Sequence, residues 1–559
     1  MGGMLSGQVA MIVLIAVPIA LFLSILLQWI YLRSVKRSMM HSEGAMPPAD
    51  PHDPPPSAPL APLGFATDLW SLDLPPSTAK SLRRRAALVY IAGGIVYGAV
   101  LTLFYLAALG QATEIFRFRT PLLIGVFAFP LVLTLAVTIT VSWRELCGIV
   151  FIYAVAMTLI YIPQLMVGAD WSAFFTLFFL FNLPGLVLAT IFLLPRVRTV
   201  GPLVLGLTLA AVAGALLSNH ALFYENPERL MAFVKFGTSI GLGGLQLYYS
   251  VMAIGALLLG IAGWLVMRLV GKLYRDRRIS DQTMIADSIW LIFSVVHASS
   301  MIHSGVQYFF APFIAFAAGR MTIAAGFLFL RARYGVAEKV PNLLLLRVFS
   351  LGRRSSRLFN KVSRLWRYRG SIHMIAGPDL ASTTVEPHEF LGFLSGRLAR
   401  RFIADDRSFQ RRLSEVEQRL DLDGRYRVGD FFCHDNAWRM VLTRLARRAD
   451  VILMDLRGFT PKHQGCVFEI REIVNRIPFA RVVFVIDGTT DEPFLRKTFT
   501  EAWVDVPASS PNVAAQRDVT LFRLGDGQTS DVKALVRLLE ALSRSETMPE
   551  QSSVRYAPA

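Results

Sequence analysis

The chain has 559 residues, of which 54% are hydrophobic and only 17% are charged, and its mean hydropathy is +0.48. Soluble domains are about 45–50% apolar and about 25% charged, so the composition excludes a disordered chain, a collagen-like fibre and a disulfide-rich secreted module. The formal net charge is +17. The arginines cluster at the ends of apolar runs, which favours anionic lipid over nucleic acid as the partner of this charge.

The first 331 residues contain long apolar runs, whereas the sequence from 340 onward resembles an ordinary soluble protein. Each run is near or above the roughly 20 residues that cross a bilayer, so we predict about nine membrane-spanning helices. The predicted spans are 8–31, 86–109, 120–142, 146–167, 172–194, 199–218, 239–270, 284–305 and 308–330. Between the first two, the proline-rich residues 46–63 predict an extended, exposed linker.

The distribution of positive charge predicts the orientation of these spans. No Lys or Arg precedes the first run, and Arg33, Lys36 and Arg37 follow it. Cytoplasmic loops carry the excess of positive residues, so we expect the N-terminus outside and the C-terminal domain in the cytoplasm. The sequence therefore predicts a multi-pass protein of the plasma (inner) membrane.

The expected domain organisation follows from these boundaries. It comprises an N-terminal anchor (1–37), a proline-rich cytoplasmic linker (38–85), a polytopic domain of about eight helices (86–333), a basic juxtamembrane segment (340–369), a cytoplasmic α/β domain (370–546) and a disordered tail (547–559).

Three ionisable residues fall at membrane depth within the last two spans: Asp287, His297 and Arg320. Such groups are costly in lipid and often functional, so one hypothesis is a polar pathway or ligand pocket. The alternative is a structural polar contact inside the helix bundle.

Residues 343–369 carry eight Lys or Arg residues and no acid, and their apolar residues recur at roughly helical spacing. This pattern predicts an amphipathic helix lying on the inner leaflet, with 347–369 contacting anionic lipid headgroups. A solvated basic linker is the alternative.

From residue 371 onward, short apolar runs alternate with helical stretches. The predicted strands are 371–376, 425–432, 450–456, 481–487 and 519–524, and the predicted helices are 387–403, 436–448, 464–477, 491–503 and 530–544. Alternating β and α elements predict a parallel sheet covered by helices. The expected fold is therefore a multi-span α-helical membrane domain followed by a cytoplasmic three-layer α/β domain with a five-stranded parallel sheet.

Ligands of such sheets bind beyond the carboxyl ends of the strands. Candidate ligand-binding residues at this edge are Gly377, Asp379, His434, Asp455, Arg457 and Cys466. The sequence has no G-x-G-x-x-G, no Walker P-loop and no serine nucleophile elbow. The three cysteines lack ligand spacing, so we expect no metal site.

Residues 449–474, ADVILMDLRGFTPKHQGCVFEIREIV, resemble the central segment of TIR domains, in which a buried strand leads through a polar loop into a helix that opens with Trp-Cys-x-x-Glu. Here Gly465 replaces the tryptophan, whereas Cys466 and Glu469 keep their register. The resemblance implies a flavodoxin-like fold. It also implies, from the enzymatic branch of that family, that Glu469 is the catalytic residue for cleaving NAD.

The carboxylate of Glu469 suits that chemistry, because cleavage of the nicotinamide bond develops positive charge on the ribose. The alternative is an ordinary acid in the first turn of a helix. Three functions remain open: a membrane-anchored signalling domain that binds or cleaves NAD, a non-enzymatic scaffold or receptor that self-associates or recruits partners, and a transporter or channel with a regulatory cytoplasmic domain.

Overall fold

The computed structural model describes most of the chain. The described residues are 2–40, 60–67, 78–110, 119–192, 201–223, 227–301, 304, 306–334, 340–347, 353–376, 393, 402–415, 420–421, 423–434, 436–514, 518–525 and 529–545. The predicted tail 547–559 and most of the predicted helix 387–403 lie outside them, and residues 402–403, at the end of that helix, form a strand instead.

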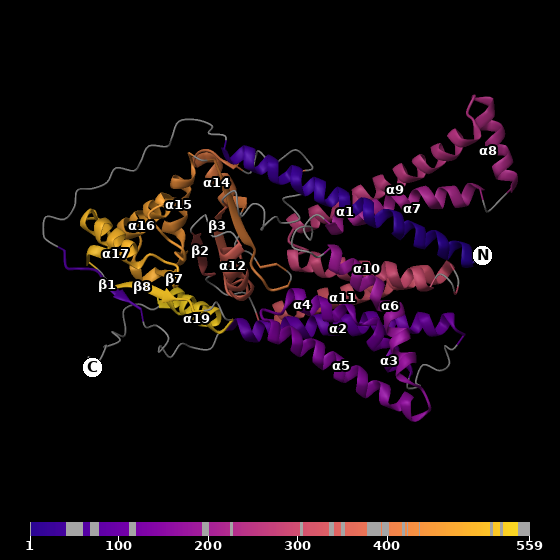
Figure 1. Ribbon diagram of the computed structural model, residues 1–559, viewed down its shortest axis with the longest axis horizontal. Helices are drawn as coiled ribbons and strands as arrows, with labels where there is room; N and C mark the ends of the chain where they lie inside the picture. Colours follow the sequence, from indigo (N-terminus) through magenta and orange to yellow (C-terminus); the bar gives the residue numbers. More distant parts are fainter. Residues whose placement is uncertain are drawn as a thin grey trace. The chain divides into compact units, whose positions relative to one another are not determined.

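The chain folds into two compact units. The first contains residues 1–33, 85–334 and 385–396, and the second contains residues 34–84, 335–384 and 397–559. Figure 1 shows helices in the first unit and a sheet with helices in the second.

Helices make up the first unit. They are α1 (Gly2–Met40), α2 (Thr78–Ala108), α3 (Arg119–Phe127), α4 (Pro130–Thr138), α5 (Trp143–Met166), α6 (Trp171–Phe192), α7 (Gly201–Phe223), α8 (Pro227–Ser239), α9 (Gly244–Arg275), α10 (Asp281–Met301), the short η4 (Val306–Phe310) and α11 (Ala311–Tyr334). Residues 34–40 at the end of α1 and 78–84 at the start of α2 are assigned to the second unit.

Seven of the described helices are long and apolar enough to cross a membrane, as expected for a multi-pass membrane protein. The predicted span 120–142 consists of two helices, α3 and α4, which are bent by 42° relative to each other; as one broken span they would make eight. The predicted span 199–218 falls on α7, whose apolar stretch Leu203–Asn219 is shorter than a spanning helix. The predicted number of nine therefore depends on these two segments.

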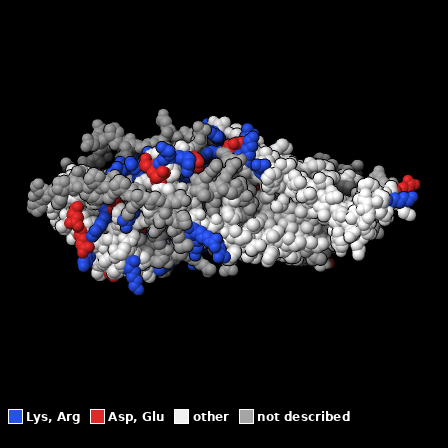
Figure 2. Space-filling view, turned by 90° about the horizontal axis from the view of Figure 1, so that it is seen from above, with Lys and Arg blue, Asp and Glu red and all other residues white. Residues whose placement is uncertain are grey.

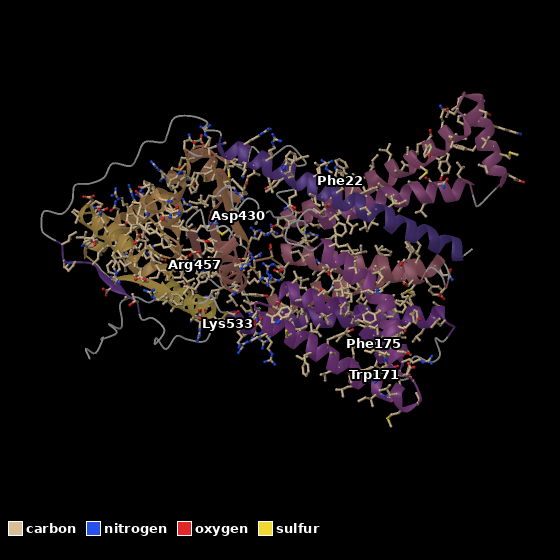
Figure 3. The ribbon with its side chains drawn as sticks, viewed as in Figure 1. Phe22, Trp171, Phe175, Asp430, Arg457 and Lys533 are labelled. Carbon is tan, nitrogen blue, oxygen red and sulfur yellow. The ribbon has the colours of Figure 1, made fainter. Side chains whose placement is uncertain are left out.

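Many apolar side chains of these helices point outward. On α6, Trp171 is 41% exposed and Phe175 is 48% exposed, and both project from the ribbon in Figure 3. The face seen in Figure 2 has few charged residues over the apolar helices and many over the α/β unit. An apolar exterior of this extent is expected where lipid, rather than water, is the solvent.

Glycines allow the helices of the first unit to pack closely. A Cβ on Gly98 of α2 would lie 2.5 Å from the backbone oxygen of Ile124, and a Cβ on Gly319 of α11 would lie 2.8 Å from that of Gly93. The Gly94-x-x-x-Gly98 pair thus serves packing inside this bundle, which is the common use of small residues between membrane helices.

A fully parallel sheet forms the second unit. Its strands are β1 (Gly64–Ala66), β2 (Asn342–Arg347), β3 (Ser371–Ala376), β4 (Phe402–Ile403), β5 (Val428–Cys433), β6 (Val451–Asp455), β7 (Val482–Ile486) and β8 (Asp518–Arg523). Their order is β1-β8-β7-β6-β2-β3-β5-β4. The five predicted strands are all present, but the sheet has eight strands instead of five.

The central strand, β2, is the main correction to the sequence analysis. Residues 342–347 pair in register with β3 on one side and with β6 on the other. The run Leu343–Leu346 is almost fully buried, as expected for a parallel strand covered on both faces. The sequence analysis assigned this run to a surface helix because four consecutive leucines carry no periodicity that separates strand from helix.

The second unit has seven described helices. They are α12 (Arg353–Trp366), α14 (Asp406–Glu415), α15 (Trp438–Arg448), α16 (Gln464–Arg476), α17 (Glu492–Val504), α18 (Pro511–Ala514) and α19 (Thr529–Ser545), with the short η7 (Phe479–Arg481). The predicted helices 436–448, 464–477, 491–503 and 530–544 correspond to α15, α16, α17 and α19.

Helix α12 confirms the amphipathic pattern of the basic segment, but its apolar side packs inside the protein. Leu358, Val362 and Trp366 are each at most 3% exposed, and α12 contacts α19 and β3. The indole nitrogen of Trp366 donates to the carbonyl of Ser371 at 3.0 Å. The apolar residues of α12 are therefore not available for contact with lipid. The expected lipid contact of this segment now depends on its arginines alone.

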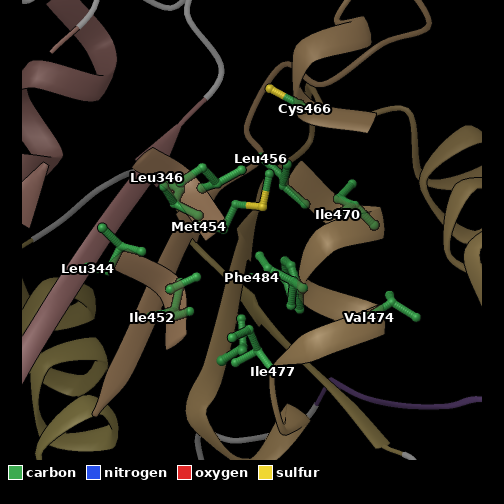
Figure 4. Close-up of a cluster of buried hydrophobic side chains, with 14 of the residues drawn as sticks. Leu344, Leu346, Ile452, Met454, Leu456, Cys466, Ile470, Val474, Ile477 and Phe484 are labelled. Carbon is green, nitrogen blue, oxygen red and sulfur yellow. The ribbon is translucent and has the colours of Figure 1, made fainter. Parts of the chain in front are cut away.

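Alternate residues of the central strands point to the same side of the sheet and form a core with α15, α16 and α17. Leu344, Leu346, Ile452 and Met454 belong to this cluster together with Ile470, and Figure 4 shows their side chains converging. Because consecutive strand residues face opposite sides, the intervening partners Leu345 and Leu453 face the other side of the sheet.

Candidate functional site

The strand order places a switch point beside β2. Leaving out the two edge strands, the order β5-β3-β2-β6-β7-β8 runs 3-2-1-4-5-6 along the chain. The sheet therefore winds outward from β2 in one direction and then from β6 in the other. Ligands of doubly wound sheets bind beyond the carboxyl ends of the strands at this point, so the ends of β2 and β6 define the candidate site.

The last residues of these two strands are charged and lie next to each other. Arg347 ends β2, Asp455 ends β6, and the two are Cα partners in the parallel register. Asp455 is fully buried and Arg347 is 4% exposed. Sequence analysis identified Asp455 but missed Arg347, which it had placed in the basic membrane segment.

A buried ion pair secures the loop after β6. Arg457 donates from Nε to Asp455 Oδ1 and from a terminal nitrogen to Oδ2, each at 2.7 Å. Ser355, on the first turn of α12, donates from Oγ to the same Oδ2 at 2.7 Å. Gly458 then adopts a φ of +67°, which lets the chain turn directly after Arg457. Of the candidate ligand-binding residues, Asp455 and Arg457 are therefore paired with each other.

A second ion pair links α12 to the end of β7. Arg354 donates from a terminal nitrogen to Asp487 Oδ2 at 2.8 Å, and its other terminal nitrogen lies 3.2 Å from Thr489 Oγ1. The Arg354 side chain is 51% exposed, whereas Asp487 is 7% exposed. The site therefore presents one accessible guanidinium, a group suited to carboxylate or phosphate.

Glu469 lies on α16, which follows the loop after β6. It is 2% exposed, and its Oε2 atom has no hydrogen-bond partner among the described residues. Burial raises the pKa of Glu469 to about 8, and the guanidinium of Arg347 partly opposes this shift. The group is therefore mainly neutral at pH 7. Because α16 begins at Gln464, Glu469 also lies beyond the first turn of the helix, so the first-turn position expected from the sequence is wrong.

Cys466 lies on the same helix, one turn before Glu469. It is 2% exposed, and its Sγ is 3.8 Å from the carbonyl oxygen of Arg347. The thiol packs within the hydrophobic cluster of the second unit. This placement is that of a small buried side chain rather than of an exposed nucleophile.

The remaining predicted edge residues contribute less. Gly377 and Asp379 lie outside the described residues. His434, after β5, is 7% exposed, and its Nδ1 is 2.8 Å from the carbonyl oxygen of Ser38. His434 is thus held by a backbone group, and β3 and β2 separate its strand from β6.

The membrane-depth residues form two polar contacts in the first unit. Arg320 Nε lies 3.0 Å from Asp287 Oδ1, joining α11 to α10. The hydroxyl of Tyr97 on α2 is 2.9 Å from Nδ1 of His297, which is fully buried. A small cavity between these contacts is lined by Gly93, Tyr97, Asp287, Trp290, Phe316, Gly319, Arg320 and Ile323.

The sequence analysis also did not identify three other residues of this site, Arg354, Ser355 and Asp487. Asp487 ends the predicted strand 481–487, and a position at the end of a buried strand is the signal that identified Asp455, so Asp487 could have been found in the same way. Arg354 and Ser355 belonged to a segment predicted to lie on the membrane, and only the position of β2 brings them to the edge of the sheet.

No protein-family model matches the chain, and no curated protein matches it. The strand order 3-2-1-4-5-6 differs from the flavodoxin-like order 2-1-3-4-5 that the resemblance to TIR domains implied. The resemblance therefore rests on residues 449–474 alone. In the described part of the chain, no group of three or more His, Cys, Asp or Glu residues is arranged to hold a metal ion.

Proposed function

We propose that this multi-pass membrane protein carries a cytoplasmic α/β domain that binds a phosphate-bearing nucleotide at the carboxyl ends of β2 and β6, and that it cleaves the nicotinamide bond of NAD there. The strand order supports a ligand at this edge, and Arg354 supplies an exposed positive group for a phosphate.

One observation carries the catalytic part of the proposal: the buried carboxyl of Glu469 has an unsatisfied oxygen beside Arg347. Buried polar atoms without a partner are rare and often have a functional reason. The nicotinamide ring of NAD is cationic, so its arrival would favour the ionised form of Glu469.

The reaction balances with water as the only co-substrate. The bond between the ribose C1′ and the ring nitrogen breaks, and its electron pair stays on nicotinamide. Water adds to C1′ and releases a proton, which gives ADP-ribose. The carboxylate of Glu469 would stabilise the positive charge that develops on the ribose.

The test uses the full chain in lipid nanodiscs, incubated with NAD, with nicotinamide release as the measurement. Glu469→Gln should reduce release at least about a hundredfold, as loss of an electrostatic stabiliser typically does. Glu472→Gln is the matched control, because Glu472 is a buried acid on the same helix that pairs with Arg476. Binding of NAD without release would favour a non-enzymatic receptor, and neither binding nor release would contradict the proposal.

A second candidate is a transporter or channel, because Asp287 and Arg320 are ionisable groups at membrane depth that line a small cavity, large enough for about one water molecule. Ionisable groups at membrane depth commonly mark ion and proton paths. Proton flux into liposomes that contain the protein, read with a pH-sensitive dye, tests it. The flux should be lost in Arg320→Ala if the cavity conducts, and protein-free liposomes give the background.

A further inference from the structure

The outer edge of the sheet is completed by a segment from the linker between the first two membrane helices. We propose that the edge of β8, together with α17, is a peptide-docking groove, and that residues 60–66 of a second copy of the chain can occupy it in place of the resident segment. Two copies would then exchange their edge strands.

Backbone pairing defines the register of the resident segment. Gly64, Phe65 and Ala66 pair in parallel with Asp518, Val519 and Thr520. Without β1, the strand β8 would present its unpaired edge, which is a template for another strand. Recognition of an extended peptide by such an edge derives affinity from main-chain bonds and specificity from pockets for alternate side chains.

Side-chain contacts make the groove selective. The ring of Phe65 packs edge-on against Phe499 of α17 at 5.9 Å between centroids, and the guanidinium of Arg496 lies 4.5 Å from the Phe65 centroid. At Gly64 the position of a Cβ is filled by the carboxylate of Asp518. An aromatic residue directly after glycine is thus the pattern that fits.

The proline-rich residues before β1 extend the contact. The indole nitrogen of Trp503 donates to the carbonyl of Ala61 at 2.9 Å, and Leu60 and Leu63 pack against the core of the second unit. The sequence analysis expected residues 46–63 to be an exposed linker. Ala61 and Pro62 are exposed as expected, whereas Leu60 and Leu63 are half-buried, and their contacts extend the groove beyond the three-residue strand.

The occupant is a second copy of the chain, because each copy carries residues 60–66 between two connecting segments. The groove fits the sequence LAPLGFA, and every copy of the chain carries that sequence. The strand has only three residues, and its side chains are only partly buried. The connections 41–59 and 67–77 can extend roughly 60 Å and roughly 35 Å. Exchange of an identical element between protomers is a common route to dimers.

The experiment mixes two single-cysteine versions of the full chain in the same membrane. One carries Ala66→Cys and the other Thr520→Cys, with Cys147, Cys433 and Cys466 replaced by alanine in both. These two positions are Cα partners across the strands, so a disulfide between different copies that forms above the level of chance collisions reports docking in trans. The double variant Ala66→Cys/Thr520→Cys reports docking within one chain.

Mixed copies should give a covalent dimer that a synthetic peptide of residues 58–68 suppresses, and Phe65→Ser should reduce its yield about tenfold. Pairing Ala66→Cys with Glu501→Cys, an exposed position on α17, measures chance collisions. Crosslinking in the double variant without any mixed dimer would overturn exchange between copies. Absence of crosslinking in both would overturn the docking itself.

Discussion

The carboxylate of Asp455 is held by the guanidinium of Arg457, only two residues further along the chain, through two nitrogen–oxygen contacts of 2.7 Å. Both side chains are buried, at 0% and 6% exposed. A bidentate pair of this kind offsets the desolvation of its two charges only while both partners remain in place.

The variant Arg457→Ala should therefore lower the free energy of unfolding by about 3–5 kcal/mol, because it leaves the Asp455 carboxylate buried and unpaired. Arg457→Lys should lose less, since it keeps the charge but not the fork geometry. Chemical denaturation of the full chain in detergent, followed by tryptophan fluorescence, measures both effects. Lys497→Ala, which breaks an exposed pair with Glu501, is the control and should change stability by about 0.5 kcal/mol or less.

Glu469 should make stability depend on pH. Its pKa is about 8 in the folded protein and near 4.5 without burial, so the folded state holds an extra proton between these values. The stabilisation is fully present below pH 4.5 and is lost as the pH rises through 8. Thermal unfolding midpoints measured from pH 5 to 9 should fall more steeply for the wild type than for Glu469→Gln. Equal slopes would mean that the carboxyl titrates normally.

The effects on stability of substituting Asp287 and Arg320 should be coupled. Either single change to alanine leaves one charge at membrane depth, whereas the double change removes both. The double variant should thus be more stable than the sum of the single losses predicts, by about 1–3 kcal/mol. Thermal unfolding in detergent measures the cycle, and simple additivity would show that the two side chains do not interact.

In helix α12, the apolar residues should stabilise the fold, whereas the basic residues are predicted to contact lipid. Substitutions of each kind should therefore have different effects. Trp366→Ala should destabilise the second unit by about 3–5 kcal/mol, because the buried indole leaves a cavity. Arg357→Glu changes an exposed side chain and should leave stability within about 0.5 kcal/mol.

Lipid contact is tested separately with the same Arg357→Glu variant. In nanodiscs that contain anionic lipid, spin labels near residue 357 should approach the headgroups in the wild type and less closely in the variant. The same approach distance in purely zwitterionic nanodiscs would remove anionic lipid from the explanation.

The sequence by itself determined the division between apolar helices and a parallel α/β unit, together with five strands and four helices of that unit. These are local properties: an apolar run long enough to cross a bilayer, or a buried strand next to an amphipathic helix, needs no distant partner to be recognised. Asp455 and Arg457 were identified for the same reason, since Asp455 lies at the end of such a strand and Arg457 directly follows it.

Only the tertiary structure decided which segments lie together. Leu343–Leu346 became the central strand because β3 and β6 flank it, and this pairing brought Arg347 beside Asp455 and Ser355 onto the same carboxylate. Residues 64–66 became an edge strand, and Ala61 became bonded to Trp503, through contacts with β8 and α17, more than 400 positions away in the chain. Pairing across such distances depends on complementary surfaces, which hydrophobic periodicity within a single segment does not encode.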